Sequence, residues 1–148
     1  MSNNFLKYWF KGFNESLGNI GESDRNEILK QCGRACSDSY TKEIYLNEYK
    51  NSNNFMDFLT LLKNKFPEID FKLDKENKLV ILKYNYCACD LVKNDYIKNA
   101  LFCECSRQSL LYNWGSVFGE NNVSVKIIKS ILGGHNCCQF EICVNNME

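Results

Sequence analysis

The feature that most constrains the fold is a change of hydrophobic period at Pro67, the one proline in the chain. Before Pro67, apolar residues recur every three or four positions, which is the period of a helix. After it, residues 69–74 alternate apolar with charged side chains, which is the period of a strand. The sequence therefore predicts a helical first half and a second half that contains strands.

Four helices are predicted before Pro67, at about residues 4–17, 23–35, 41–50 and 55–66. The first carries an aromatic stripe that we expect to lie on the core. Ser23 and Asn54 are residue types that cap helix N-termini, so we expect them to begin the second and the fourth helix.

The second half reads as hairpin, helix, hairpin. Residues 68–86 form the first hairpin, 106–118 an amphipathic helix that ends at Gly119, and 123–144 a second hairpin with a glycine-containing turn. We therefore expect an α+β fold in a single domain over residues 1–148, with an antiparallel sheet of about four strands covered by helices on one face.

The charge balance bears on the possible partners. Lys and Arg number 18 and Asp and Glu also number 18, so no basic footprint for nucleic acid or a membrane surface is present. The N-terminal residues lack the apolar segment of a signal peptide, and no stretch approaches the length of a membrane span. These features predict a cytoplasmic protein that binds neither nucleic acid nor membrane.

Cysteine is the unusual component, with nine residues in the chain. In a reducing cytosol such a density points to metal binding or catalysis rather than to disulfides. Three closely spaced pairs make up the predicted metal site for zinc or an iron–sulfur cluster: Cys32, Cys36, Cys87, Cys89, Cys103 and Cys105.

Two other readings of these thiols remain open. Cys87, Cys89, Cys103 and Cys105 could be reduced, partly buried side chains around a pocket. Near Cys32 and Cys36, the small residue Gly33 could instead let a neighbouring element pack closely against the helix. Later in the chain, Cys138 alternates with apolar residues and is expected in the core, with Cys137 and Cys143 on the opposite, semi-exposed side.

Four residues are candidates for chemistry or substrate binding. Cys105 is a candidate nucleophile near a predicted helix N-terminus, and His135, the one histidine, could serve as its base or be a solvated turn residue. Arg34 could clamp a carboxylate substrate or point to water. Trp114, on the amphipathic helix, is the second predicted substrate-binding residue.

The C-terminal third, from FCECS to CCQFEI, resembles the 4-vinyl-reductase-type domains and the related 2-amino-thiazoline-4-carboxylate hydrolase-like proteins. The short motif CGRAC is similar to one in cysteine-rich relatives of the second group. The resemblance implies a fold like that of the 4-vinyl-reductase and TRAPP-type domains, with small ligands between helices and sheet. It also implies a zinc site in sensor members, of which this chain keeps Cys103 or Cys105 together with Cys138, but has Ser130 and Ile127 at the two remaining positions.

Three functional hypotheses follow. The first is a small-molecule-binding or sensor module with a cysteine-rich site. The second, implied by the resemblance, is a cysteine- or metal-dependent hydrolase of a small sulfur-containing acid. The third is a structural or interaction protein with reduced cysteines that forms a homodimer through its helices.

Overall fold

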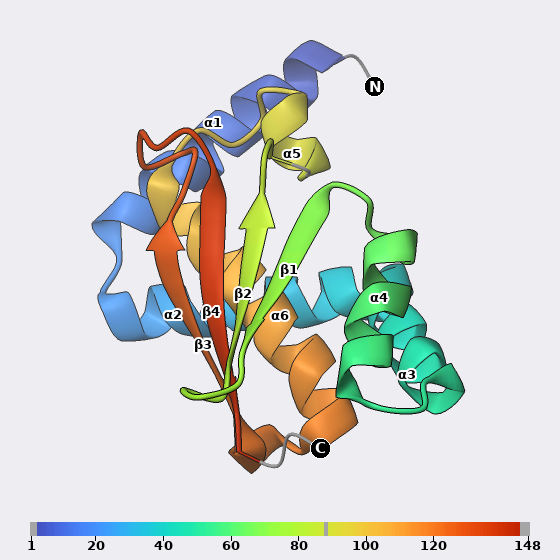
Figure 1. Cartoon of the computed structure of the whole chain (residues 1–148). Helices are drawn as coiled ribbons and strands as arrows, with labels where there is room; N and C mark the ends of the chain where they lie inside the picture. The colour runs from blue at the N-terminus through green and yellow to red at the C-terminus, as the bar shows by residue number, and fades with distance from the viewer. Residues whose placement is uncertain (1–2, 88, 146–148) are drawn as a thin grey trace.

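The computed structural model describes residues 3–87 and 89–145. Its elements, in chain order, are α1 (Asn3–Asn19), α2 (Glu22–Cys36), η1 (Ser37–Thr41), α3 (Lys42–Asn51), α4 (Phe55–Lys65), β1 (Ile69–Asp74), β2 (Leu79–Tyr84), α5 (Asp90–Lys93), η2 (Ala100–Phe102), α6 (Cys103–Phe118), η3 (Glu120–Asn122), β3 (Val123–Lys129) and β4 (Cys138–Val144). The predicted α+β class and both predicted hairpins are confirmed (Figure 1).

The two hairpins join into one four-stranded sheet in the order β1-β2-β4-β3, and every neighbouring pair is antiparallel. The hairpins meet along β2 and β4, where Tyr84 lies opposite Cys138 and Leu82 opposite Phe140. The register of β3 against β4 shifts between Ile127 and Lys129. The end of β2 and the start of β4 therefore lie side by side, which brings residue 87 into the neighbourhood of Cys138.

The sheet has one covered and one open face. The covered face carries buried residues of all four strands: Ile69, Val80, Leu82, Val123, Val125, Phe140, Ile142 and Val144. They pack with α4 and α6, and Figure 1 shows the helices behind the sheet. Polar side chains such as Lys72 and Lys126 alternate with these residues and lie exposed on the open face. The prediction of helices on one face is confirmed.

Helix boundaries agree with some of the expected caps. Asn54 accepts a hydrogen bond from the backbone nitrogen of Asp57 at 2.8 Å, so it caps α4 as predicted. Ser23 does not cap α2, because this helix already begins at Glu22 after Gly21. Helix α6 begins at Cys103, earlier than the predicted start near residue 106, because η2 leads directly into its first turn.

One helical run extends without a break from Glu22 to Asn51. Its middle section, η1, is a π-helix, in which the backbone widens to accommodate an extra residue. The residues at both junctions, Cys36 and Lys42, keep right-handed helical angles. Helices α2 and α3 are therefore two ends of one continuous rod that crosses behind the sheet (Figure 1).

A second, smaller apolar cluster lies beyond one end of the sheet. Its buried members are Leu17, Leu29, Ile97 and Phe102. Phe10 and Phe13 of α1 are half-buried against this cluster, whereas Trp9 is 55% exposed. The aromatic stripe of α1 thus covers the small cluster with one edge only, and α1 and α5 lie together at the top of Figure 1.

The burial of the cysteines at the start of β4 differs from the prediction. Cys137 is buried at 4% exposure, so the prediction that it is semi-exposed is wrong, and Cys138 is only half-buried. Cys137 precedes β4, so the alternation of the strand does not extend to it. Among the helices of the described residues, none has the length and apolar character needed to cross a membrane.

Candidate functional site

Helices α2 and α6 cross and touch at Gly33. A Cβ atom on Gly33 would lie 2.6 Å from the carbonyl oxygen of Cys105 and 2.9 Å from the backbone nitrogen of Ser109. Real Cβ atoms do not approach backbone so closely, so only glycine permits this crossing. The close packing that the sequence left open at Gly33 is confirmed.

This crossing gathers four thiols from three segments. Cys32 and Cys36 flank Gly33 on α2 and are exposed, while Cys105 lies opposite on α6. Burial, followed by the charges of Cys32, Cys36, Cys89 and Cys103, raises the pKa of Cys105 to about 12. Burial also raises the pKa of Cys36, followed by the charges of Cys89 and Asp90. The thiol of Cys89 therefore lies within electrostatic reach of both helices. We call Cys32, Cys36, Cys89 and Cys105 the outer thiol group.

A second set of thiols lies at the end of the sheet. Burial raises the pKa of Cys103, a hydrogen bond with Ser130 lowers it, and the charges of Cys138, Cys87 and, least, Cys89 raise it. The Sγ atom of Cys138 accepts a hydrogen bond from the backbone nitrogen of Ile131 at 3.3 Å. Cys103 and Cys138 are thus both anchored to the segment that follows β3. We call Cys87, Cys103 and Cys138 the inner thiol group.

The six cysteines predicted as metal ligands divide between these two groups. In the parts of the chain that the structure describes, no three His, Cys, Asp or Glu side chains are arranged to hold a metal ion. The zinc set implied by the resemblance lacks a ligand at Ile127, which pairs with Phe140 inside the sheet. A metal or cluster at these cysteines stays a prediction.

The predicted catalytic pair lies in two different settings. Cys105 is packed against the small apolar cluster, and its raised pKa keeps it a protonated thiol at neutral pH. His135 lies exposed in the turn before β4, where its Nδ1 is 3.2 Å from the carbonyl oxygen of Ser130. Among the described residues, no hydrogen bond joins Cys105 and His135. Their catalytic roles stay predictions, and the raised pKa of Cys105 counts against a nucleophile.

Arg34, predicted to clamp a carboxylate, already holds one from its own chain. Its Nη2 lies 2.9 Å from Oε1 of Glu120, and its guanidinium stacks over the ring of Tyr112 at 5.2 Å. The side chains of Arg34, Tyr112 and Glu120 line a shallow hollow of about 310 Å³ between α2 and the end of α6. A ligand carboxylate at this hollow would have to displace the exposed Glu120. The clamp stays a prediction.

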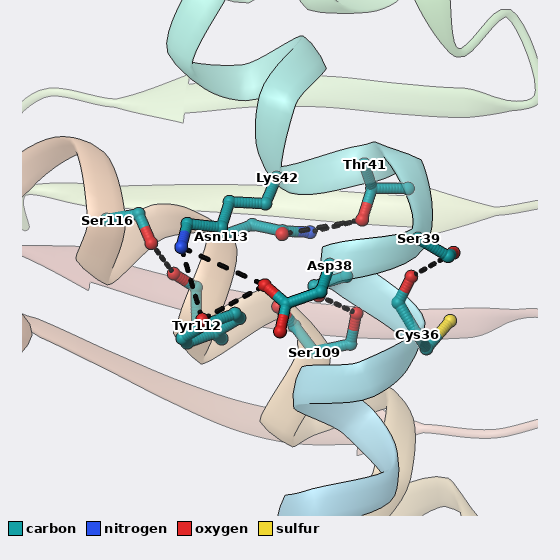
Figure 2. Close-up of polar contacts among 10 residues, drawn as sticks. Cys36, Asp38, Ser39, Thr41, Lys42, Ser109, Tyr112, Asn113 and Ser116 are labelled. Atoms are coloured by element: carbon teal, nitrogen blue, oxygen red, sulfur yellow. Dashed lines mark hydrogen bonds and ion pairs between the residues drawn. The ribbon is translucent and has the colours of Figure 1, made fainter.

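Beside this hollow, polar contacts fasten η1 to α6 (Figure 2). The hydroxyl of Tyr112 donates to Asp38 at 3.1 Å, and Lys42 donates to the same hydroxyl at 3.1 Å. Deeper in the interface, the hydroxyls of Ser37 and Ser109 lie 2.6 Å apart, and Ser37 is fully buried. Buried polar groups of this kind fix one relative position of two helices, because any slip leaves them unsatisfied.

Another pair of this interface joins Thr41 and Asn113. The side-chain nitrogen of Asn113 lies 3.2 Å from the hydroxyl of Thr41, and Asn113 is only 3% exposed. Asn113 directly precedes Trp114 on α6. The interface that fastens η1 therefore also positions the indole of Trp114.

Trp114, the second predicted substrate-binding residue, is the centre of the large core. It is fully buried, and its ring lies 5.7–6.3 Å from four aromatic rings: Tyr45, Phe55, Phe58 and Phe118. We call these five residues the aromatic cluster. The sequence pointed to Trp114 but not to Tyr45, because nothing local indicates that residue 45 faces residue 114.

The indole nitrogen of Trp114 is an exception to the pairing of buried polar groups. Within the described residues, Nε1 has no hydrogen-bond partner of acceptable geometry. The phenol oxygen of Tyr45 is a nearby acceptor: burial raises the pKa of this phenol and the approach of the Trp114 donor lowers it, but the two groups are not aligned as a hydrogen bond. Leaving a buried donor without a partner costs about 1–3 kcal/mol of stability, so folded proteins rarely retain one.

Comparisons with known proteins inform the fold alone. No protein-family profile matches the sequence, and no curated protein matches it at a significant level. Among solved structures, the chain is similar to the phenol-responsive sensory domain of the transcription activator PoxR with phenol, with a TM-score of 0.57 and 8% sequence identity. The match covers 97% of this chain and 75% of that one. This chain therefore has the fold of a domain with a sensory role in another protein.

Proposed function

We propose that this chain is a small-molecule-sensing module whose ligand site is the aromatic cluster around Trp114. The observation that carries the proposal is the buried Nε1 of Trp114, which forms no well-aligned hydrogen bond even though the Tyr45 hydroxyl is nearby. A ligand with an acceptor oxygen would satisfy this donor. The similarity in fold to a phenol-responsive sensory domain supports the same class of ligand.

The cluster favours a small, uncharged, aromatic ligand. All five of its members are aromatic, and none carries a charge at neutral pH. An aromatic guest would keep ring contacts of the kind that already fill the site, and a charged one would lose its hydration without a partner. The phenol hydroxyl matches Nε1 as an acceptor.

Tyr49 offers a route into the cluster. Its ring is 44% exposed and packs edge-on against Phe58 at 5.4 Å and Phe118 at 5.3 Å. Tyr49 lies on α3, which ends only two residues later. Rotation of this side chain would open the cluster from solvent without breaking the sheet.

Phenol titration tests the proposal directly. The chain has two tryptophans, so Trp9→Phe leaves Trp114 as the one indole whose fluorescence reports on the cluster. We expect phenol to change this emission and to release or absorb heat in calorimetry. Trp114→Phe keeps a ring but removes the donor, so affinity should fall roughly 2- to 10-fold. Trp9, on the exposed side of α1, is the matched control, and Trp9→Phe should bind phenol like the unmodified chain.

Two related compounds test which features of phenol the site recognises. Cyclohexanol has the hydroxyl without the aromatic ring, and benzoate adds a charge, so both should bind more weakly than phenol. Benzoate binding that disappears in Arg34→Gln would instead place the ligand in the hollow beside Arg34. Equal phenol affinity of Trp114→Phe and the unmodified chain would contradict the proposal.

A further inference from the structure

The outer thiol group lies apart from the aromatic cluster and takes no part in the proposed ligand site. Cys32 and Cys36 are four residues apart on α2, so their side chains leave the same face of the helix about one turn apart. The buried stripe of α2 that meets α6, formed by Leu29, Gly33 and Ser37, lies directly beside that exposed face. The two sulfurs therefore lie along one edge of the helix crossing.

The third thiol is fixed by the crossing itself. The carbonyl of Cys105 is the backbone atom closest to a Cβ built on Gly33, which sets this turn of α6 directly against α2. The Cys105 side chain is half-buried in the cluster that contains Leu29 of α2. Cys105 thus lies between the two helices at the level of the Cys32–Cys36 pair.

The fourth thiol comes from the segment before α5. Cys89 directly precedes this short helix, and its carbonyl accepts hydrogen bonds from Val92 and Lys93. Leu91 and Val92 pack in the same apolar cluster as Leu29 and Cys105. The residues that follow Cys89 therefore pack in an apolar cluster that both helices share, which places Cys89 near the crossing.

We propose that Cys32, Cys36, Cys89 and Cys105 form a binding site for one thiophilic metal ion, for which Zn²⁺ is the probe. Four thiolates are a complete ligand set for tetrahedral zinc, with Zn–S distances of about 2.3 Å. Each thiol gives its proton to solvent as it binds, and the cation offsets the mutual repulsion of the thiolates.

Binding requires side-chain movement, because no three of these groups are in ligating positions in the described residues. Cys32 and Cys36 are both exposed, so rotation about their Cα–Cβ bonds meets no packed neighbour in the core. In Figure 2, the Cys36 sulfur points away from the polar network of Ser109 and Tyr112, so turning it breaks none of those contacts. The ion would join three segments that are distant in sequence and should raise thermal stability.

The experiment adds Zn²⁺ to the reduced, metal-free full chain and measures bound zinc after desalting, with Co²⁺ as a spectroscopic substitute for tetrahedral sulfur coordination. We expect one ion per chain. Cys32→Ser and Cys36→Ser alter exposed side chains and should keep the fold while weakening zinc binding by at least about tenfold. Cys143→Ser, at the far end of β4, and Cys138→Ser, in the inner thiol group, are the matched controls and should bind zinc normally.

Several outcomes would overturn the proposal. They are the absence of stoichiometric zinc, retention of full affinity in both Cys32→Ser and Cys36→Ser, or loss of zinc in Cys138→Ser with binding intact in the α2 variants. Half an ion per chain, with a dimer in light scattering, would also exclude a site within one chain. None of these results depends on phenol binding, so this proposal and the proposed function fail independently.

Discussion

At the residue scale, Gly33 has the clearest structural role. Its missing side chain lets the backbones of α2 and α6 meet, and both the outer thiol group and the polar interface of η1 follow from that contact. A glycine inside a helix normally costs about 1 kcal/mol relative to alanine. Here the cost is offset by a packing that no other residue allows.

Gly33→Ala should lower the free energy of unfolding by about 1–3 kcal/mol, since the new methyl group would overlap the Cys105 carbonyl and push the helices apart. Gly12 on α1 is the matched control, because a Cβ there meets nothing within 4 Å. Gly12→Ala should leave stability unchanged or raise it by up to about 1 kcal/mol. Urea unfolding of both variants provides the measurement, and equal effects would contradict the close-contact explanation.

Cys105 should be slow to alkylate in the folded protein. With a pKa raised to about 12, roughly one thiol in 100,000 is ionised at pH 7, and only the thiolate reacts. The exposed Cys32 serves as the internal comparison. Peptide mapping after brief iodoacetamide treatment should find label on Cys32 well before Cys105. Rapid labelling of Cys105 would favour the hydrolase hypothesis instead.

At the scale of elements, the π-helix η1 is fastened to α6 by side chains that pair with one another. Ser37 is fully buried, and its hydroxyl binds both the hydroxyl and the carbonyl oxygen of Ser109. Such a pair matters for stability mainly because removing one hydroxyl leaves the other buried without a hydrogen-bond partner. The contribution of the interface can therefore be measured by removing the partners singly and together.

Ser37→Ala and Ser109→Ala should each lower the free energy of unfolding by about 1–2 kcal/mol. The double variant should lose less than the sum, because the second change removes a hydroxyl that is already without its partner. Thermal or urea unfolding of the four proteins completes the cycle. Strict additivity would mean that the two hydroxyls do not interact.

Elements differ in how well the sequence predicts them. Both hairpins could be predicted, because alternation along a half-buried strand leaves a local signal, and Asn54 is a local cap. The π-helix could not, since the widened turn depends on the pairing of Ser37 and Thr41 with a helix 72 residues away. Ser23 is a local cap signal that the structure does not use, because α2 already begins at Glu22, with Gly21 at the cap position.

The candidate sites follow the same rule. Trp114 can be predicted as a candidate ligand residue, because a large aromatic residue on an amphipathic helix is a local feature. Its neighbour Tyr45 cannot, because their contact depends on how α3 crosses α6. The division of the cysteines into two groups also depends on tertiary packing. Cys103 and Cys105 are separated by one residue, yet the Cys103 side chain bonds Ser130 and the Cys105 side chain packs in the cluster that contains Leu29 of α2.

At the scale of the whole molecule, the buried titratable groups set the response to alkaline pH. Burial raises the pKa values of Cys105 and Tyr45 above those of the same groups in an unfolded chain. Because both groups are neutral when folded, their contribution to stability is complete below the unfolded pKa values of 9.0 and 10.0. It is lost as the pH rises above those values, since the unfolded state then releases protons more readily.

We therefore expect the urea midpoint to fall between about pH 9 and pH 11 in reducing buffer. Tyr45→Phe removes one of the groups, so its midpoint should fall less steeply over that interval than that of the unmodified chain. Tyr8→Phe, at an exposed position on α1, is the matched control and should follow the unmodified chain. A midpoint that stays constant to pH 11 would contradict the burial of these groups.

The unbroken helix from Glu22 to Asn51 has a mechanical consequence. Cys32 and Cys36 lie near its middle, just before η1, and Tyr45 in the section that follows packs beside Trp114. Because the helix is unbroken, a ligand that rotates the sulfur-bearing section is expected to shift the Tyr45 ring as well. Two chemically unrelated signals would then meet in a single rotation.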